Sequence, residues 1–330
     1  MATYLYIATA MGLFIATQTD GNWNLIRHTL QEKSLTSVTA FDGVILAGST
    51  EGIWRSADDG KSWKAADENL SIRHVRWMAH SLSPQSIFLV GTEPAGIFVS
   101  WDGGKTWDGR PEIGELRDAN GWFLPYSPNA GCVRGFAAAK TENHGGRIYA
   151  AVEVGGVLIS DDSANSWRLA EGSDGSPEMN RDLGTMIHPD VHSITVHPAS
   201  ADLVNAATGG GLYRSADGGR SWKNIYRCYM RAIWVDPVDH RHLIAGPADG
   251  VSRNGRIEES GDGGKTWQLA SDGMAATPWP KHMVERFVQS DDELFAVLSN
   301  GELWRKGLDL PSWQRVLPQI RQIKAVAVVK

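Results

Sequence analysis

Seven short segments of the chain can be aligned at their starts, and five of them begin with a polar, an apolar and a polar residue, several of which can bind anions. The segments read LTSVTAF, HVRWMAH, CVRGFAA, DVHSITV, YMRAIWV, HMVERFV and QIKAVAV. Aligned by eye, the second polar position holds Ser37, Arg76, Arg134, His192, Arg231, Val284 and Lys324. The first holds Leu35, His74, Cys132, Asp190, Tyr229, His282 and Gln322. Residues i and i+2 share one side of a strand, so this pattern predicts a polar, basic side.

A concave surface lined by one sign of charge concentrates counter-ions. Arg76, Arg134, Arg231 and Lys324 are therefore predicted to bind an anionic ligand. Like charges gathered in this way also need local compensation. Glu93 and Glu153 lie in the same chain segments as Arg76 and Arg134, so the alternative is structural pairing of arginine with glutamate.

Internal repeats indicate how these side chains are positioned. The strings SADDGKSW (56–63), GIFVSWDGGKTW (96–107), GVLISDDSANSW (156–167), GLYRSADGGRSW (211–222) and SGDGGKTW (260–267) recur, and degenerate copies flank them. The closing tryptophans are Trp23, Trp63, Trp107, Trp167, Trp222, Trp267 and Trp313, spaced by 40 to 60 residues. That period suits one four-stranded blade, so the chain is predicted to be an all-β, seven-bladed propeller.

The two ends of the chain complete this prediction. Residues 323–329 (IKAVAVV) resemble a first strand without a successor, and residues 3–9 (TYLYIAT) resemble a second strand without a predecessor. Their pairing would close the ring and remove its open edges. Residues 1–330 are then expected to form a single propeller domain, whose first strands line a central channel.

The repeated turn explains its own residue types. An aspartate accepts hydrogen bonds from backbone N–H groups just downstream, glycine supplies a positive φ, and tryptophan fills the space between blades. The pattern resembles the Asp-box or BNR-repeat superfamily (Ser/Thr-x-Asp-x-Gly-x-Ser/Thr-Trp) over nearly the whole chain. This resemblance implies a β-propeller. It leaves function open, since the superfamily includes sialidases, other glycoside hydrolases, sortilin-type receptors and a photosystem II assembly factor.

The resemblance suggests an enzyme acting on an acidic sugar or another carboxylate. Sialidases use three arginines, a tyrosine nucleophile and acidic residues; here Arg76, Arg134 and Arg231 would form the clamp, with Tyr229 or Tyr126 as nucleophile. The acids or bases would be Glu93, Glu153 and Asp190. The Arg-Ile-Pro motif is absent and sialidases have six blades, so a true sialidase is not expected. A lyase or isomerase using His74, His192 or His282 as general base is equally open.

Three connections are long enough to suggest a function. Segments 108–132, 168–191 and 268–282 are predicted to cover the basic channel mouth, with Trp122, Tyr126 and Trp279 contacting a ligand. Within the second, His188, Asp190 and His192 have the spacing for one side of an extended strand. No cofactor is expected, and the alternative is a metal-dependent enzyme that uses this histidine cluster.

Composition narrows the partners. A formal charge of -6 indicates no nucleic-acid footprint, and no apolar run reaches about 18 residues, so no membrane contact is expected. Two cysteines, Cys132 and Cys228, and the lack of a signal-peptide pattern favour a reduced, cytoplasmic protein. The hypotheses are an enzyme acting on an anionic small molecule and a non-catalytic scaffold that binds a protein across the same basic mouth.

Overall fold

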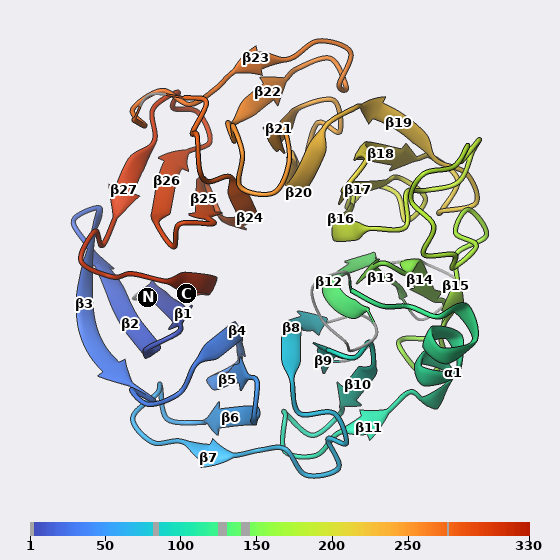
Figure 1. Cartoon of the computed structure of the whole chain (residues 1–330). Coiled ribbons are helices and arrows are strands. Elements are labelled where there is room, and N and C mark those ends of the chain that lie inside the picture. Colours follow the sequence, from blue (N-terminus) through green and yellow to red (C-terminus); the bar gives the residue numbers. More distant parts are fainter. Residues whose placement is uncertain (1–2, 82–85, 125–130, 140–145, 276) are drawn as a thin grey trace.

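Seven four-stranded antiparallel sheets form a closed ring around a central channel (Figure 1). The structure is a computed structural model that describes residues 3–81, 86–124, 131–139, 146–275 and 277–330. The predicted seven-bladed propeller is confirmed. The innermost strand of each blade lies at the channel, and the outermost lies at the rim of the ring.

The blades are numbered along the chain, and their strands have the following bounds. Blade 1 contains β28 (Ile323–Val329), β1 (Tyr4–Thr9), β2 (Gly12–Thr19) and β3 (Asn22–Thr29). Blade 2 contains β4 (Leu35–Phe41), β5 (Val44–Ser49), β6 (Gly52–Ser56) and β7 (Lys64–Ala65). Blade 3 contains β8 (Val75–Ser81), β9 (Ile87–Thr92), β10 (Ile97–Ser100) and β11 (Asp108–Gly109). Blade 4 contains β12 (Cys132–Ala139), β13 (Arg147–Glu153), β14 (Gly156–Ser160) and β15 (Arg168–Leu169).

The second half of the ring repeats the same order. Blade 5 contains β16 (Val191–Val196), β17 (Val204–Thr208), β18 (Gly211–Ser215) and β19 (Lys223–Tyr226). Blade 6 contains β20 (Tyr229–Val235), β21 (Leu243–Ala248), β22 (Glu258–Ser260) and β23 (Gln268–Leu269). Blade 7 contains β24 (Val284–Ser290), β25 (Glu293–Leu298), β26 (Leu303–Gly307) and β27 (Gln314–Val316).

The ring closes through the predicted pairing of the two ends of the chain. Strand β28 lies antiparallel to β1, with Tyr4 opposite Val329 and Ile7 opposite Val326. Ile7 is fully buried and Val326 nearly so. Closure therefore pairs an edge that would otherwise expose unpaired backbone N–H and C=O groups.

The turn between the third and fourth strands has the predicted hydrogen bonding. In blade 5, the carboxylate of Asp217 accepts the Ser215 hydroxyl (2.7 Å), the Ser221 N–H (2.9 Å) and the Ser221 hydroxyl (2.6 Å). The same contacts recur around Asp58, Asp102, Asp162 and Asp262. These aspartates close turns.

Arginines on the third strands attach these turns to neighbouring blades. Arg55 Nε donates to the Gly103 carbonyl of the next blade at 2.7 Å, and Arg214 Nη1 donates to that of Gly263 at 3.0 Å. These bonds supplement the apolar side chains buried between blades.

One helix departs from the all-β prediction. Segment 108–132, expected to be a loop, contains α1 (Pro111–Asn120), which begins at a proline and ends at Gly121 with φ 64°. Proline suits the first helical position and glycine the left-handed residue after the last. Ile113 anchors the helix in the core between blades 3 and 4. Among the described residues, no helix is long and apolar enough to cross a membrane.

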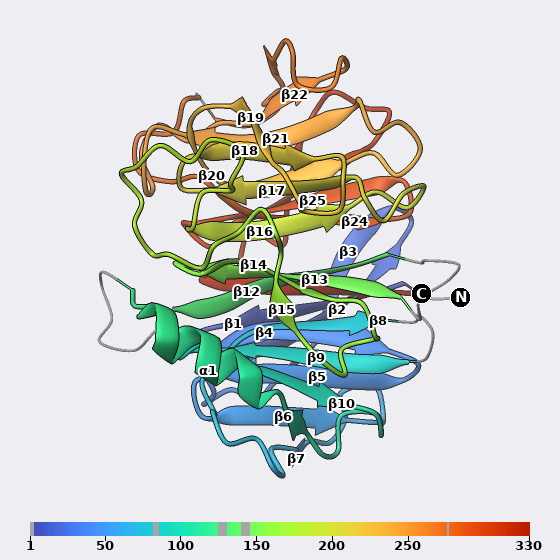
Figure 2. The ribbon, with the colours of Figure 1, turned by 90° about the vertical axis from the view of Figure 1, so that its right-hand side faces the viewer.

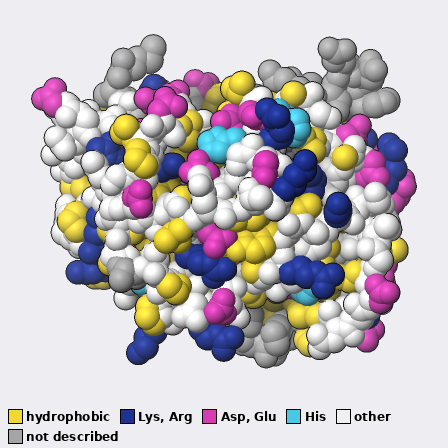
Figure 3. All heavy atoms as spheres, turned by 90° about the horizontal axis from the view of Figure 1, so that it is seen from above, with side chains coloured by type: hydrophobic (Ala, Val, Ile, Leu, Met, Phe, Trp, Pro, Cys, Tyr) yellow, Lys and Arg dark blue, Asp and Glu magenta, His cyan; other side chains and the backbone are white. Residues whose placement is uncertain are grey.

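The two faces of the ring differ. Strand β1 begins and strand β28 ends at one face (right in Figure 2), where the other second strands also begin. The starts of the first strands lie at the opposite face. Figure 3 shows the ring edge-on, from the top of Figure 1, and on this outer surface basic and acidic side chains are interspersed.

Candidate functional site

Each of the seven channel-lining strands contains one extra residue near its start. In blade 3, for example, Val75 pairs with Thr92 and Trp77 pairs with Gly91, so Arg76 is an unpaired β-bulge residue. The seven positions are occupied by Thr36, Arg76, Arg134, His192, Arg231, Glu285 and Lys324. A bulge re-aims the side chain of the extra residue, and all seven of these residues are polar.

The bulges correct the alignment made from sequence. In blades 2 and 7 the predicted residues Ser37 and Val284 are wrong, because both are paired in the ladder. Thr36 and Glu285 occupy the equivalent positions. The correction matters most in blade 7. There the carboxylate of Glu285, in place of the predicted apolar side chain of Val284, lies at the centre of the basic cluster.

Six of the bulge residues line one cavity of about 280 Å³ at the start of the first strands. The charged side chains that line it are Arg76, Arg134, Arg231, Glu285, Arg286 and Lys324. Five cations therefore face a single carboxylate. Arg76, Arg134 and Arg231 converge as predicted, and Lys324 joins them from β28.

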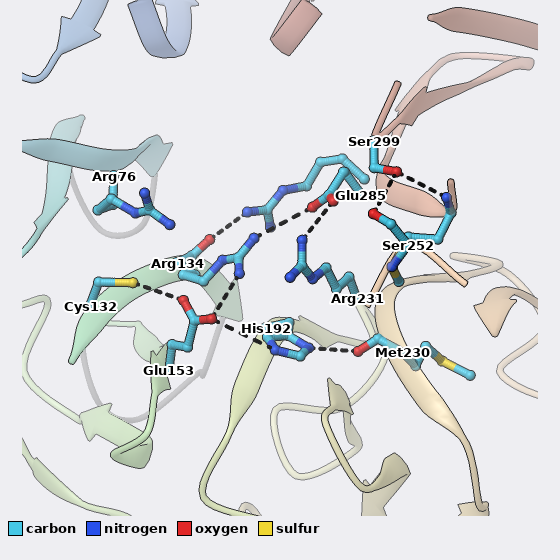
Figure 4. Close-up of polar contacts among 12 residues, drawn as sticks. Arg76, Cys132, Arg134, Glu153, His192, Met230, Arg231, Ser252, Glu285 and Ser299 are labelled. Carbon is cyan, nitrogen blue, oxygen red and sulfur yellow. Dashed lines mark hydrogen bonds and ion pairs between the residues drawn. The ribbon is translucent and has the colours of Figure 1, made fainter. Parts of the chain in front are cut away.

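Three glutamates pair with these arginines, and Figure 4 shows the pairs made by Glu153 and Glu285. Arg134 lies between carboxylates of two blades: Nη1 is 3.2 Å from Glu153, and Nη2 is 3.6 Å from Glu285. Arg231 lies 2.7 Å from Glu285, and Arg76 lies 3.4 Å from Glu93. The predicted alternative, arginine–glutamate pairing, is therefore present. Burial raises the pKa of Glu285, but Arg231 and Arg134 outweigh burial and lower it, so this carboxylate is ionised at neutral pH.

Arg286 is an additional cation of the mouth that sequence reasoning missed. It extends from blade 7 to blade 3, where its guanidinium lies 3.7 Å over the Trp77 ring, and it donates to the Arg134 carbonyl at 2.7 Å. Burial, followed by repulsion from neighbouring arginines, lowers its pKa to about 9. Within the described chain, no carboxylate lies within 4.0 Å of this guanidinium. Recognising the extra residue of β24 would have revealed both Glu285 and Arg286.

A second polar group adjoins the arginines. His192 Nε2 lies 3.0 Å from Asp190 Oδ1 and 4.0 Å from Glu153 Oε1, and these three residues have the geometry to hold a metal ion. The Cys132 thiol donates to the other Glu153 oxygen at 3.1 Å. Burial raises the pKa of Asp190, but the interaction with His192 outweighs burial and lowers this pKa, so Asp190 is ionised at neutral pH.

Tyr229 lies between this group and the arginines. Its hydroxyl accepts a hydrogen bond from Arg231 Nε at 2.9 Å and lies 3.4 Å from His192 Nε2. Burial raises the pKa of Tyr229. A raised pKa disfavours the phenolate, so this environment does not activate Tyr229 as the nucleophile considered from sequence.

Two other predicted histidines lie outside the group. His282 stacks on Trp279 with ring centroids 4.9 Å apart and does not line the cavity, so its predicted convergence with the arginines is wrong. His188 accepts the Asp190 N–H through Nδ1 instead of joining Asp190 and His192 as a ligand. His74 adjoins the Arg76–Glu93 pair, because its carbonyl accepts the Glu93 N–H at 3.0 Å.

The predicted aromatic cap is also wrong where the structure describes it. Trp122 and Trp279 are 1% and 3% exposed, so they pack in the core and cannot contact a ligand over the mouth. Trp122 additionally donates to the Gly175 carbonyl at 2.7 Å. Tyr126 lies outside the described residues.

No protein-family model matches the chain, and no curated protein matches it. Among solved structures, the chain is similar to YCF48 bound to D1 peptide, with TM-score 0.61 and 15% identity over 93% of this chain and 89% of that one. It is similar to an ancestral GH74 enzyme, with TM-score 0.60 and 16% identity over 90% of this chain and 38% of the enzyme. A third is Chaetomium thermophilum Sqt1 bound to the N-terminus of ribosomal protein L10, with TM-score 0.52 and 13% identity over 93% and 81%. The chain thus spans little more than a third of the GH74 enzyme, and these likenesses establish the propeller fold.

Proposed function

We propose that this chain is a binding propeller whose channel mouth receives an anionic group of a protein partner. The observation that carries the proposal is the cavity in which five cationic side chains accompany the single carboxylate of Glu285. Glu93 and Glu153 pair with Arg76 and Arg134 from outside the cavity lining, so the five cations still outnumber three carboxylates. This remaining excess of positive charge attracts anions and strengthens their binding where water is partly excluded.

Cavity size is compatible with one acidic side chain of a larger molecule. Sites for small molecules usually enclose about 300–1,000 Å³. The mouth encloses about 280 Å³, enough for an aspartate or glutamate side chain. Two of the similar propellers, YCF48 and Sqt1, have structures with a bound peptide or protein N-terminus, which agrees with a protein partner.

Acid–base considerations disfavour Asp190 and Glu285 as the proton donor of a glycoside hydrolase. Glycoside hydrolysis generally needs one carboxyl group that stays protonated and donates its proton to the leaving group. Asp190 and Glu285 have lowered pKa values, whereas a proton donor needs a raised one. The pKa of Tyr229 is shifted away from nucleophile activation.

The test is a titration of fluorescent peptides against the purified chain. One peptide carries aspartate and glutamate, and its control carries asparagine and glutamine at the same positions. Arg134→Ala should weaken binding of the acidic peptide about 10- to 100-fold, which is the range for losing a charge-assisted hydrogen bond. Arg168→Ala is the matched control, because Arg168 is exposed on outer strand β15 and pairs with Asp161. Added salt should weaken the interaction further.

Anionic sugars and dicarboxylic acids form the second arm of the titration. Stronger binding of these molecules than of the acidic peptide, with turnover, would replace the scaffold by an enzyme acting on an acidic small molecule. Unchanged peptide affinity in Arg134→Ala, together with a lower melting temperature, would leave only the structural pairing with Glu153 and Glu285.

A further inference from the structure

A histidine and two carboxylates, His192, Asp190 and Glu153, form a compact group beside the basic mouth. Figure 4 shows His192 and Glu153 of this group. His192 Nε2 lies 3.0 Å from Asp190 Oδ1 and 4.0 Å from Glu153 Oε1. One possible ligand atom from each of the three residues lies within 4.8 Å of the others. The exposed fractions of the side chains are 1% for His192, 14% for Asp190 and 4% for Glu153. They come from β16, the residue preceding it and the end of β13, so the fold holds them together.

The other ring nitrogen of His192 identifies the tautomer. Nδ1 lies 2.8 Å from the Met230 carbonyl oxygen, which can only accept a hydrogen bond. Nδ1 therefore carries a proton, and in the neutral ring Nε2 presents a lone pair to the two carboxylates. This is the arrangement usual for metal-binding histidines, whose second nitrogen donates to a carbonyl or carboxylate.

Three electron-pair donors that lie this close together favour a cation among them, even though Arg134 also donates to Glu153 Oε1. A proton on Nε2 would serve Asp190, but Glu153 Oε1, at 4.0 Å, is beyond hydrogen-bond reach. His242 shows the contrasting arrangement. Its two carboxylates lie on opposite nitrogens, with Asp236 at 3.0 Å from Nδ1 and Glu259 at 2.6 Å from Nε2, as suits a doubly protonated ring.

We propose that Glu153, Asp190 and His192 bind a divalent transition-metal ion of the Zn²⁺ class. Nitrogen and oxygen ligands bond such an ion at about 2.0–2.2 Å, which places neighbouring tetrahedral ligands about 3.4 Å apart. The two distances from Nε2 bracket that value. Two carboxylates and a neutral imidazole also balance the charge of a divalent ion.

Neighbouring side chains complete the site. The Cys132 thiol donates to Glu153 Oε2, and Arg134 donates to Oε1 at 3.2 Å. A carboxylate oxygen has two lone pairs, so Oε1 can accept from Arg134 and bind the ion as well. Three protein ligands leave a fourth position for water on the side of Tyr229, whose hydroxyl is 3.4 Å from Nε2. The three proposed ligands do not line the anion-binding cavity, and Arg134 is the residue that contacts both sites.

The experiment measures Zn²⁺ and Co²⁺ binding to the chelator-treated full chain. Competition with a chromophoric chelator should show one tight site per chain, and the melting temperature should rise with free Zn²⁺ because the ion binds the folded state. Asp190→Asn and Glu153→Gln keep side-chain volume and should each weaken binding by at least about tenfold, since even outer-shell changes cost that much. Asp236→Asn, in the His242 cluster, is the matched control and should leave Zn²⁺ affinity unchanged.

Two results would overturn the site. The first is the absence of a one-to-one site in the folded wild-type chain. The second is Zn²⁺ affinity that is equal in wild type, Asp190→Asn and Glu153→Gln. Nitrogen NMR of His192 gives an independent readout: a doubly protonated ring that Zn²⁺ does not alter also contradicts the proposal. Near-ultraviolet circular dichroism shows whether each variant is folded. If one of the two carboxylate variants does not fold, the other is sufficient for the test.

Discussion

The guanidinium of Arg286 lies 3.7 Å over the ring of Trp77, so a side chain of blade 7 crosses the channel to blade 3. The same guanidinium donates to the backbone of blade 4. Blades 7 and 3 are not neighbours in the ring, and the contact therefore narrows the channel beside the cavity. It also adds a cation without a carboxylate partner in the described chain, which increases the attraction of the mouth for anions.

Arg286→Met should weaken binding of the acidic peptide by about tenfold, comparable to the loss of one charge-assisted contact. Its free energy of unfolding should change by less than about 1 kcal/mol. Methionine keeps a favourable contact with the Trp77 ring, and removing a desolvated charge offsets the lost hydrogen bond. Peptide titration and urea unfolding measure the two quantities. Full peptide affinity in this variant would exclude Arg286 from the anion site.

Glu285→Gln should change affinity in the opposite direction. Removing the single carboxylate from the cavity lining should strengthen binding of the acidic peptide, because Glu285 no longer repels the negative charges of the peptide. The free energy of unfolding should fall by about 1.5–3 kcal/mol, since Arg231 and Arg134 lose a charged partner. The lowered pKa of Glu285 means that its contribution is present above pH 4.5 and is lost as pH falls through the folded-state pKa. Weaker peptide binding would instead indicate that Glu285 orients Arg231 for the ligand.

Asp217→Ala should destabilise the fold and leave peptide affinity per folded molecule unchanged. The turn loses an acceptor of hydrogen bonds from Ser215 and Ser221, which should cost about 1–2 kcal/mol. The turn lies on the face opposite the mouth. Asp217→Asn retains one acceptor oxygen and should lose less. Urea unfolding and peptide titration provide the test, and a stable variant with lost binding would contradict the assignment of the faces.

His242 should make stability depend on pH near neutrality. The hydrogen bond to Glu259 raises its pKa, burial opposes this, and Asp236 raises it further. The folded chain therefore holds the proton at pH values where the unfolded chain has lost it. This stabilisation is complete below about pH 6.5 and is lost as pH rises through the folded-state pKa. His242→Gln should flatten that part of the profile of unfolding free energy against pH. An unchanged slope would show that His242 does not hold the proton.

The sequence by itself determined the propeller, its number of blades and its closure. These features follow from local signals: most of the repeated turns carry their aspartate, glycine and tryptophan within a few residues, and the two inner strands of each blade have five to eight residues. Both half-blades at the ends of the chain also carry unmistakable strand patterns. The basic mouth was predictable for the same reason, because Arg76, Arg134 and Arg231 occupy equivalent positions in repeated strands.

Tertiary structure alone decided which side chains meet. A bulge adds one residue to a strand, and a shift of one residue moves a side chain to the other face, so an ungapped alignment selected Val284 where the ring presents Glu285. Arg286 contacts Trp77, which lies more than 200 residues earlier in the chain, and no local sequence pattern predicts this contact. Glu153 reaches Asp190 and His192 only because neighbouring blades pack side by side. Trp122 and Trp279 were predicted to meet a ligand, but burying their large apolar surfaces in the core is more favourable.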